Sequence, residues 1–313
     1  MKYFKLRIHG TDKERFIEKL TVVDLARMSV GQSALSVFTN EKGGVLDDTV
    51  ITCKADHLHL VNNAGCSEKI KSHLLEHSVK FDVKVSFENL SLIAVQGPLS
   101  QKVVEKVFGE KFEDLKFMHC TTVKFGDENV TVSRCGYTGE DGFEISVSEK
   151  NVVKLVERML EDGDVKMAGL GARDTLRMEA GLCLYGHEID EQTGPIEAGL
   201  GWTISKRRRN EGGFLGSEFV LKNLNEGVET KRVGIIVSGA PARSGADILD
   251  VEGKIVGRVT SGGPSPSLKQ NIAMGYIRRE HCKVGTEIKV NVRGRNQLAK
   301  VAKLPFVAHN YKK

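Results

Sequence analysis

Short runs in which apolar and polar residues alternate recur along the whole chain, and they constrain the fold more than any other feature. Alternation with a period of two predicts half-buried strands, whereas a period near 3.6 predicts helices. Up to about residue 205 the two patterns are interleaved. The strands expected there are 2–8, 33–38, 45–52, 57–61, 82–87, 91–96, a hairpin at 121–134 and 143–148, and the expected helices are 12–20, 68–77, 100–107, 150–160 and 171–180.

The pattern changes beyond residue 205, where one short helix near 216–222 is followed by closely spaced strands. Glycine and proline separate these strands, and strands at this spacing favour a small barrel or jelly roll. Residues 206–213 are the best candidate for a linker. The expected strands are 231–238, 254–260, 272–278, 285–292 and 297–304.

We therefore predict an α+β protein with more than one domain. Its 313 residues suffice for two to three ordinary domains. The expected parts, with approximate boundaries, are an N-terminal α/β part at 1–88, a second α/β part at 89–205 and a C-terminal β-barrel domain at 206–313.

Composition and charge exclude several classes of protein. No apolar run approaches the ~20 residues that span a bilayer, so a membrane protein is not expected. The net charge of +5, from 46 basic and 41 acidic residues, does not demand a nucleic-acid partner. The six cysteines form no CxxC pair, which argues against a zinc knuckle and fits a reducing compartment. The chain begins with a strand-like run, not with a signal or transit peptide.

Two adjacent acids, Asp47 and Asp48, stand in an otherwise apolar strand within the run GGVLDDTVI (43–51). Neighbouring residues of a strand point to opposite faces, so one carboxylate can face solvent while the other points to the interior or to a cavity. A carboxylate within such a strand needs a partner. An exposed pair near a strand end is an equally good interpretation of the pattern.

The run RCGYTGEDGFE (134–144) places three glycines, three acids and a tyrosine in one connection. Three acids cannot all be buried, so we expect most of them to be solvated. Glu144 differs because an apolar strand resumes around it. A carboxylate there can accept two N–H bonds from a heteroaromatic amidine edge, such as a pterin presents. A turn that leads into a hairpin edge is the alternative.

Two further loops carry charged or small polar residues. Arg173, in GLGARDTLRME (169–179), stands in the first turn of an expected helix and can hold a carboxylate, with an internal ion pair as the alternative. The stretch TSGGPSPSLK (260–269) can form an anion nest, or a loop that packs beside a site. It lacks the Gly-Lys-Ser/Thr of a P-loop, so nucleotide binding is not expected.

Two short patterns have simple structural interpretations beside functional ones. HLLEH (73–77) matches H-x-x-E-H and would place His73 and His77 on one helix face as zinc ligands, but a surface helix is the simpler interpretation. The dense basic run at 206–209 is typical of a solvated turn, and docking of an acidic partner is its functional interpretation. It comprises Lys206, Arg207, Arg208 and Arg209.

Taken in order, seven segments resemble the aminomethyltransferase (T-protein) family of the glycine cleavage system. They run through nearly the whole chain, so together they are more specific than any single motif. They are FTNEKGGVLDDTVIT (38–52), VNNAGC (61–66), VQGP (95–98), RCGYTGEDGFEISV (134–147), AGLGARDTLRMEAGLCLYG (168–186), VTSGGPSPSLKQNIAMGY (259–276) and PFVAHNY (305–311). The animal mitochondrial branch of the family resembles the chain most.

The resemblance implies a fold and a reaction. Members of the family have three interleaved domains in a cloverleaf around a central folate cavity, and the third is a small β-barrel or jelly roll. They take the aminomethyl group from the lipoyl arm of H-protein, release ammonia and pass the carbon to tetrahydrofolate, which gives 5,10-methylenetetrahydrofolate. Tetrahydrofolate is a co-substrate, and neither PLP nor a metal takes part. The implied partners are lipoylated H-protein and the other glycine cleavage components.

The resemblance also implies roles for individual residues. Asp48 matches the second Asp of the family's LDD motif, whose carboxylate lies near the reacting folate nitrogen and is implicated in catalysis. Glu144 matches the glutamate that holds the pterin edge. The other matches to the folate site are Arg173, Tyr311, Asn63 and Tyr137. The basic run at 206–209 becomes a candidate surface for H-protein.

Several alternatives accompany this interpretation. A non-catalytic, folate-binding relative of the iron–sulfur assembly type would carry a Lys-Gly-Cys-Tyr-like motif, whereas this chain has Arg-Cys-Gly-Tyr at 134–137. A folate domain of a sarcosine or dimethylglycine dehydrogenase would not need H-protein. Family members usually carry tens of residues before the first expected strand, so an inactive shortened isoform is a further alternative. The implied location is the mitochondrial matrix, or the cytoplasm for a bacterial source.

Overall fold

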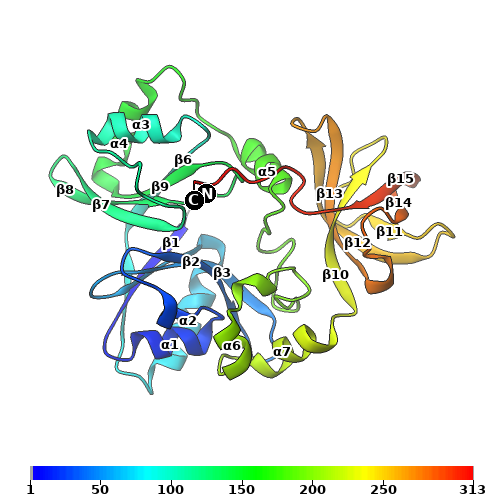
Figure 1. The fold of residues 1–313 in the computed structure, drawn as a ribbon, viewed down its shortest axis with the longest axis horizontal. Helices are drawn as coiled ribbons and strands as arrows, with labels where there is room; N and C mark the ends of the chain where they lie inside the picture. The colour runs from blue at the N-terminus through cyan, green and yellow to red at the C-terminus, as the bar shows by residue number, and fades with distance from the viewer. Residues whose placement is uncertain (1–2, 313) are drawn as a thin grey trace.

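The computed structural model describes residues 3–312, which form three lobes around a common centre (Figure 1). Two lobes are open sheets with helices packed on them, and the third is a closed barrel. The segment that follows the barrel runs back to the centre of the molecule. The predicted α+β class with a C-terminal barrel is confirmed. In the described part of the chain, no helix is both long and apolar enough to cross a membrane.

The first sheet is antiparallel and has the strand order β2-β3-β4-β1-β5. Helices α1 (Lys13–Leu20) and α2 (Ser67–Ser78) pack on one face, where their apolar side chains form a core with Leu6, Ile51 and Leu60. The opposite face is turned toward the centre. The strands are β1 (Tyr3–His9), β2 (Ser33–Thr39), β3 (Val45–Cys53), β4 (Leu58–Asn63) and β5 (Lys84–Glu88).

The second sheet has the order β6-β9-β8-β7 and is covered on one face by α3 (Ser100–Phe108) and α4 (Glu149–Leu160). Phe143, Ile145 and Val147 of β9 pack toward these helices. Side chains alternate along a strand, so Glu144 points away from the helices, toward the centre. The strands are β6 (Leu90–Gln96), β7 (His119–Phe125), β8 (Glu128–Arg134) and β9 (Gly142–Ser148).

The third lobe is a closed barrel with the strand order β10-β13-β12-β11-β14-β15. Inward-facing residues such as Ile235, Ile248 and Val290 form its separate core. The short strand β11 was not among our expected strands, and β12 extends into the stretch that we had interpreted as a loop. The strands are β10 (Thr230–Val237), β11 (Asp247–Leu249), β12 (Ile255–Ser265), β13 (Gln270–Arg278), β14 (Glu287–Val292) and β15 (Arg295–Ala302).

The helices between the second sheet and the barrel correct two expectations. Residues 206–213 are not a linker, because α6 (Lys206–Glu211) begins there with the Ser205 side chain as its cap. The helices α6 and α7 (Ser217–Glu226) also do not belong to the barrel, whose strands begin only at Thr230. Phe214 and Val220 pack beneath the first sheet against Val37 and Val45. The third part therefore starts later than the expected residue 206.

The serine-rich end of β12 binds an anion, but that anion is part of the protein. Glu179, at the end of α5 (Leu170–Glu179), accepts hydrogen bonds from the Ser265 hydroxyl at 2.6 Å, the Ser267 hydroxyl at 2.7 Å and the Ser267 N–H at 3.1 Å. The predicted nest thus holds an internal carboxylate and fastens the barrel to α5.

Candidate functional site

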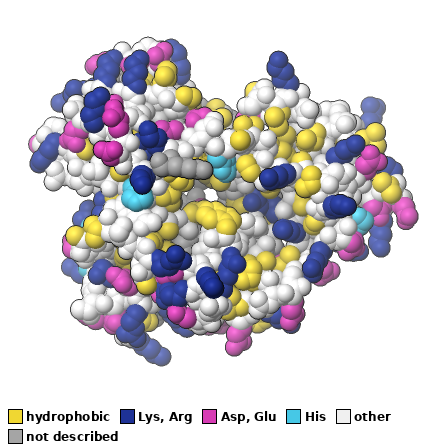
Figure 2. All heavy atoms as spheres, viewed as in Figure 1, with side chains coloured by type: hydrophobic (Ala, Val, Ile, Leu, Met, Phe, Trp, Pro, Cys, Tyr) yellow, Lys and Arg dark blue, Asp and Glu magenta, His cyan; other side chains and the backbone are white. Residues whose placement is uncertain are grey.

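A cavity of about 780 Å³ lies where the three lobes meet. Its volume is within the range of small-molecule sites. Hydrophobic side chains gather around the middle of the molecule in Figure 2. The open faces of both sheets, the segment 180–203 and the C-terminal segment contribute to its wall. All six residues singled out from the sequence for a folate site line it: Asp48, Asn63, Tyr137, Glu144, Arg173 and Tyr311.

The adjacent acids of β3 lie on opposite faces of the first sheet. Asp48 lines the cavity, whereas Asp47 is fully buried on the other side, so neither takes the solvent-facing place that we considered. Asn63 joins them, because its side-chain amide donates to Oδ1 of Asp47 and to Oδ1 of Asp48, both at 2.8 Å. Asp47 also accepts bonds from the Asn62 side chain and from the Asn63 N–H, each at 3.1 Å.

Burial in this wall changes the protonation of Asp48. It raises the pKa of Asp48 to about 7, with a further contribution from the negative charge of Asp47. The hydrogen bond from Asn63 and the positive charge of Arg173 oppose this rise. Burial also raises the pKa of Asp47. At neutral pH Asp48 therefore exists in both protonation states, a property suited to proton transfer.

Glu144 faces the cavity from the second sheet. Burial raises its pKa, and the charge of Arg173, the Cys135 thiol and the charge of Lys5 oppose the rise. Lys5 is a buried amine of β1 whose Nζ donates to the Leu90 carbonyl, and burial lowers its pKa to about 8. A carboxylate has two oxygens with several acceptor positions, so Glu144 can accept N–H donors of a ligand.

Arg173 lines the same cavity as the two acids. Its guanidinium carbon lies 4.5 Å from the centre of the Tyr137 ring, an arrangement that favours a cation–π contact. Its charge lowers the pKa of both Asp48 and Glu144 relative to burial alone. The Tyr137 hydroxyl donates to the Cys183 carbonyl, which fixes the ring under the guanidinium. The cavity thus contains two carboxylates and an arginine whose charge acts on both.

Gln96, from the VQGP motif, explains why the loop before β9 contains glycine. Its side-chain amide donates to the Cys135 carbonyl at 3.0 Å, and its oxygen accepts from the Thr138 hydroxyl at 3.1 Å. A Cβ on Gly136 would lie 1.8 Å from that oxygen, so a side chain there would displace the Gln96 amide from these bonds. Two motifs that are distant in sequence therefore form one unit that presents Tyr137 and Glu144.

The C-terminal segment completes the cavity wall with aromatic rings. Tyr311 stacks on Phe117 with 4.0 Å between the ring centres and 10° between the planes. The Phe117 N–H donates to the Lys312 carbonyl at 2.9 Å. Phe117 carries no motif and was missed from the sequence. Other lining residues that we missed are Cys183, Trp202 and Arg232.

The basic run at 206–209 is mostly engaged inside the protein, which corrects its interpretation as a docking surface. Arg208 is buried and donates to the carbonyls of Glu18 and Thr21. Arg207 pairs with Glu18, with Asp24 and with Glu211. Their charges stabilise the contact between α6 and α1 and are unavailable to a partner. Lys206 and Arg209 keep exposed side chains.

The H-x-x-E-H pattern does not form a metal site. His73 packs against Phe38 and His77, and burial lowers its pKa to about 4. Its Nε2 is buried without a hydrogen-bond partner. No third ligand joins the two histidines among residues 3–312. The pattern is that of a half-buried helix face.

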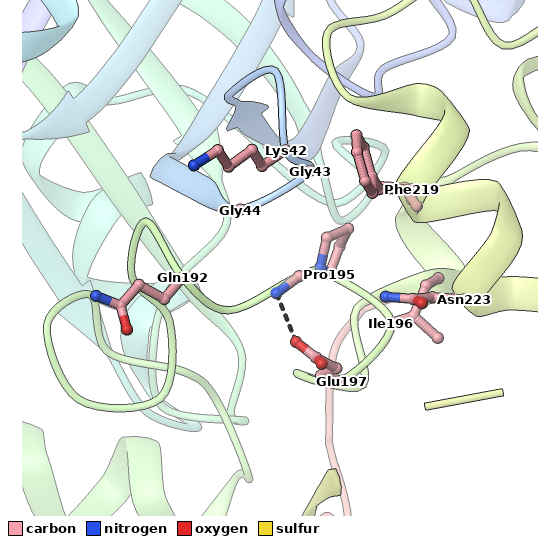
Figure 3. A pocket seen from close by; sticks show the side chains of 11 residues that line it. Lys42, Gly43, Gly44, Gln192, Pro195, Ile196, Glu197, Phe219 and Asn223 are labelled. Atoms are coloured by element: carbon pink, nitrogen blue, oxygen red, sulfur yellow. Dashed lines mark hydrogen bonds between the residues drawn. The ribbon is translucent and has the colours of Figure 1, made fainter. Parts of the chain in front are cut away.

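A second pocket, of about 90 Å³, lies beside the glycine turn before β3 (Figure 3). It is lined by Lys42, Gly44 and residues of the 192–197 loop and α7, and Glu197 accepts the Gly194 N–H at 2.8 Å. A Cβ on Gly44 would lie 1.9 Å from the Glu191 carbonyl oxygen, so the glycine permits this close contact. The volume is too small for a folate.

Comparison with known proteins agrees with this architecture. The model of the GCVT N-terminal domain matches residues 2–208, and that of the glycine cleavage T-protein C-terminal barrel domain matches residues 231–308. A crystal structure of the glycine cleavage system aminomethyltransferase T from Bartonella henselae superimposes with a TM-score of 0.95. It is 36% identical, and the match covers 99% of this chain and 86% of that one.

Curated relatives match over almost the whole chain. The mitochondrial aminomethyltransferase of Dictyostelium discoideum is 47% identical, over 99% of this chain and 81% of its own length. The mitochondrial aminomethyltransferase of Mus musculus is 44% identical, over 97% and 77%. That of Pisum sativum is 47% identical, over 98% and 78%. These values do not single out the animal branch.

The fold and the site thus define a three-lobed protein with a C-terminal barrel and a central cavity that is lined by carboxylates, arginines and aromatic rings. The chain belongs to the glycine cleavage T-protein family. Its activity is that of an aminomethyltransferase of the glycine cleavage system, as the sequence resemblance indicated. The comparisons favour this activity over a non-catalytic relative.

Proposed function

We propose that the central cavity binds tetrahydrofolate as the co-substrate and receives the aminomethyl-lipoyl arm of H-protein. The family uses tetrahydrofolate. One observation carries the proposal: the cavity brings together Asp48 and Glu144 from different sheets with Arg173, whose charge acts on both. Its volume, about 780 Å³, suits a ligand of this size. PLP and a metal have no part in this proposal.

Glu144 is proposed to hold the pterin. An ionised carboxylate can accept two parallel N–H bonds from the amidine edge of the pterin. Arg173 favours the ionised form of Glu144, since its positive charge lowers the pKa of that group. The stacked rings of Phe117 and Tyr311 offer an apolar surface to the aromatic part of the folate. Asn63 and Tyr137 keep Asp48 and Arg173 in place.

Asp48 is proposed to transfer a proton from a folate nitrogen to the leaving group. In the overall transfer, two C–N bonds form to folate nitrogens, and the bonds from the carbon to ammonia and to the lipoyl sulfur break. The two protons lost by the folate nitrogens end on ammonia and on the thiol. A carboxylate with a pKa of about 7 can accept a proton from a folate nitrogen and return it to the leaving group. Its negative form also stabilises positive charge that develops on the transferred carbon.

H-protein and the other glycine cleavage components are proposed partners, because the family takes its name from that system. Lys206 and Arg209 remain candidates for electrostatic steering of H-protein, since both are exposed. We propose the mitochondrial matrix as the location, since the curated relatives described above are mitochondrial. Charge reversal at Lys206 and Arg209 should slow association with H-protein most at low salt.

Calorimetric titration of the chain with tetrahydrofolate tests the proposal. Glu144→Ala should abolish measurable binding, because the pterin loses its acceptor. Glu252→Ala, in an exposed turn of the barrel, is the matched control and should bind as the wild type does. Equal binding by the folded Glu144→Ala variant would contradict the assignment.

Turnover with aminomethyl-loaded H-protein tests the second half of the proposal. We expect ammonia and 5,10-methylenetetrahydrofolate in equal amounts, and neither product when H-protein is omitted. Production of methylenetetrahydrofolate from formaldehyde equivalents without H-protein would instead favour the dehydrogenase-type folate domain.

A further inference from the structure

Two histidines and an aspartate meet at the end of the first sheet that lies away from the cavity. His9 ends β1, and Asp56 and His57 form the turn that leads into β4. The β1–β4 register pairs Tyr3 with Asn63, a cavity residue, and Ile8 with Leu58. Six residues separate the two ends of β1, so His9 lies about 20 Å along the strand from the level of Asn63. The cluster is therefore separate from the folate site.

The geometry of the cluster follows from this register. His9 continues the pairing opposite His57, and their ring centres are 5.1 Å apart with 33° between the planes. Oδ1 of Asp56 lies 2.7 Å from Nδ1 of His57. The three side chains each offer one ligand atom, and these atoms lie within 4.8 Å of one another. Among residues 3–312, no other set of three such side chains meets this condition.

The surroundings permit a cation at this place. The positive charge of Arg7 acts on His57, and Glu88 compensates it, with 2.5 Å between Nη2 of Arg7 and Oε1 of Glu88. His57 is buried, whereas the side chain of Asp56 is 73% exposed. A cation can thus approach from the solvent side.

We propose that His9, Asp56 and His57 bind one divalent transition-metal ion, with zinc as the ion that this donor set favours. Two imidazoles and one carboxylate form a common zinc ligand set, with water in the fourth position. Ligand atoms at zinc distances lie about 3.3 Å apart. Oδ1 of Asp56 lies closer than this to Nδ1 of His57, at 2.7 Å, and the exposed turn lets the carboxylate move outward. His9 lies at a strand end, from which its ring can turn toward the ion.

Metal binding would fasten the end of β1 to the β3–β4 turn. This role is independent of the aminomethyl transfer, and it differs from our expectation from sequence that the protein has no metal. The site is also distinct from the H-x-x-E-H pattern, which provides only His73 and His77. A structural ion of this kind stabilises the folded state, because the unfolded chain does not hold the three ligands together.

The test is a calorimetric titration of chelator-treated protein with zinc chloride at pH 7.5. The wild type should bind one ion, and His9→Ala and His57→Ala should each lower the affinity at least tenfold. Asp56→Asn changes an exposed side chain, so it retains the fold and should lower the affinity by a smaller factor. His281→Ala is the matched control, because His281 contacts Glu280 without a second histidine. It should bind as the wild type does.

Two further measurements separate this site from incidental binding to thiols. Cobalt(II) in place of zinc should give a visible ligand-field spectrum without a sulfur-to-cobalt charge-transfer band, and Asp56→Asn should alter that spectrum. Zinc should raise the Tm of the wild type and of His281→Ala, but not that of His57→Ala. Equal zinc affinity in His9→Ala, His57→Ala and the control, or a sulfur-to-cobalt band in the wild type, would overturn the proposal.

Discussion

The molecule contains two groups of buried carboxylates, and their surroundings differ. At the junction between α5 and the barrel, Glu188 is fully buried and accepts bonds from Arg177 at 2.8 Å, from the Leu184 N–H at 3.0 Å and from the Thr260 hydroxyl at 2.6 Å. Glu179 accepts three bonds in the same region. In the cavity, Asp48 accepts a side-chain hydrogen bond from Asn63 at 2.8 Å.

This difference separates structural acids from reactive ones. A carboxylate whose oxygens accept several hydrogen bonds is stabilised in its charged form, and its bonds hold two lobes together. Where the partners of a carboxylate do not offset its burial, the charged form is costly and the pKa rises, as that of Asp48 does. The first kind fixes the shape of the cavity, and the second kind can act on substrate.

Removing the charge of Glu188 should produce the largest effect on stability. Glu188→Gln leaves the buried Arg177 without its main partner, and breaking a buried pair costs about 3–5 kcal/mol. We expect a lower free energy of unfolding in urea, with nearly unchanged turnover per folded molecule. Glu287→Gln, on an exposed barrel strand, is the control. A loss below 1 kcal/mol, the range of exposed ion pairs, would show that the junction does not depend on this charge.

In contrast to Glu188→Gln, the substitution Asp48→Asn should act mainly on turnover. General acid–base groups contribute typically 10²–10⁴-fold to rate, so we expect kcat to fall at least a hundredfold. Folate affinity should change only a few-fold, because Glu144 holds the pterin. The measurement is single-turnover transfer beside calorimetry, with Asp114→Asn in an exposed turn as control. An equal loss of rate and affinity would contradict the role of Asp48 in the chemical step.

The free energy of unfolding of Asp48→Asn, relative to that of the wild type, should increase as the pH rises. The folded-state pKa of Asp48, about 7, lies above its ordinary value of 3.8, so the folded protein binds this proton more tightly than the unfolded chain. Between pH 4 and pH 7 the wild type therefore loses stability relative to Asp48→Asn, by at most about 1.4 kcal/mol per pH unit. Urea unfolding at pH 5 and pH 7.5 measures the difference, and a gap that does not widen would argue against the raised pKa.

A smaller effect is expected at the other carboxylate of the junction. Ser267→Ala removes the 2.7 Å hydroxyl bond to Glu179 but leaves the bonds from Ser265 and from the backbone. A hydrogen bond to a charged group contributes about 1.5–3 kcal/mol, so the unfolding free energy should fall by roughly 2 kcal/mol. Ser238→Ala, exposed at the end of β10, should change it little. Equal effects at the two serines would mean that Glu179 does not depend on its third donor.

Local patterns in the sequence predicted much of this molecule. Alternation along β9 placed Phe143 and Ile145 on one face and Glu144 on the other, and the structure has that arrangement. The same argument separated Asp47 from Asp48. The long-range pairs were not predictable, because nothing in the sequence indicates that Phe117 stacks on Tyr311 or that Gln96 fills the space left by Gly136.

The errors have a common physical cause. The basic run at 206–209 was interpreted as a solvated turn because charged residues are usually exposed. In the folded chain Glu18 and Asp24 lie nearby and compensate Arg207 and Arg208, so the run forms a helix against α1. The stretch at 260–269 was correctly interpreted as suited to an anion, but its anion is Glu179, about 85 residues earlier in the chain. A sequence shows which groups need partners but not which partners they find.

The smallest predicted effect concerns the pair of acids in β3. The charge of Asp47 raises the pKa of Asp48, so Asp47→Asn should lower it. If Asp48 acts as a carboxylate, turnover falls on the acid side of its pKa, and that limb of the pH–rate profile should move to lower pH by about one unit or less. Asn63→Ala should move the limb the other way, because it removes the hydrogen bond that stabilises the carboxylate form of Asp48. Nδ2 of Asn63 lies 2.8 Å from Oδ1 of Asp47, so both substitutions disturb the same part of the cavity wall. General loosening of that wall cannot move the acid limb in opposite directions. Shifts of the limb in the same direction would assign it to a group other than Asp48.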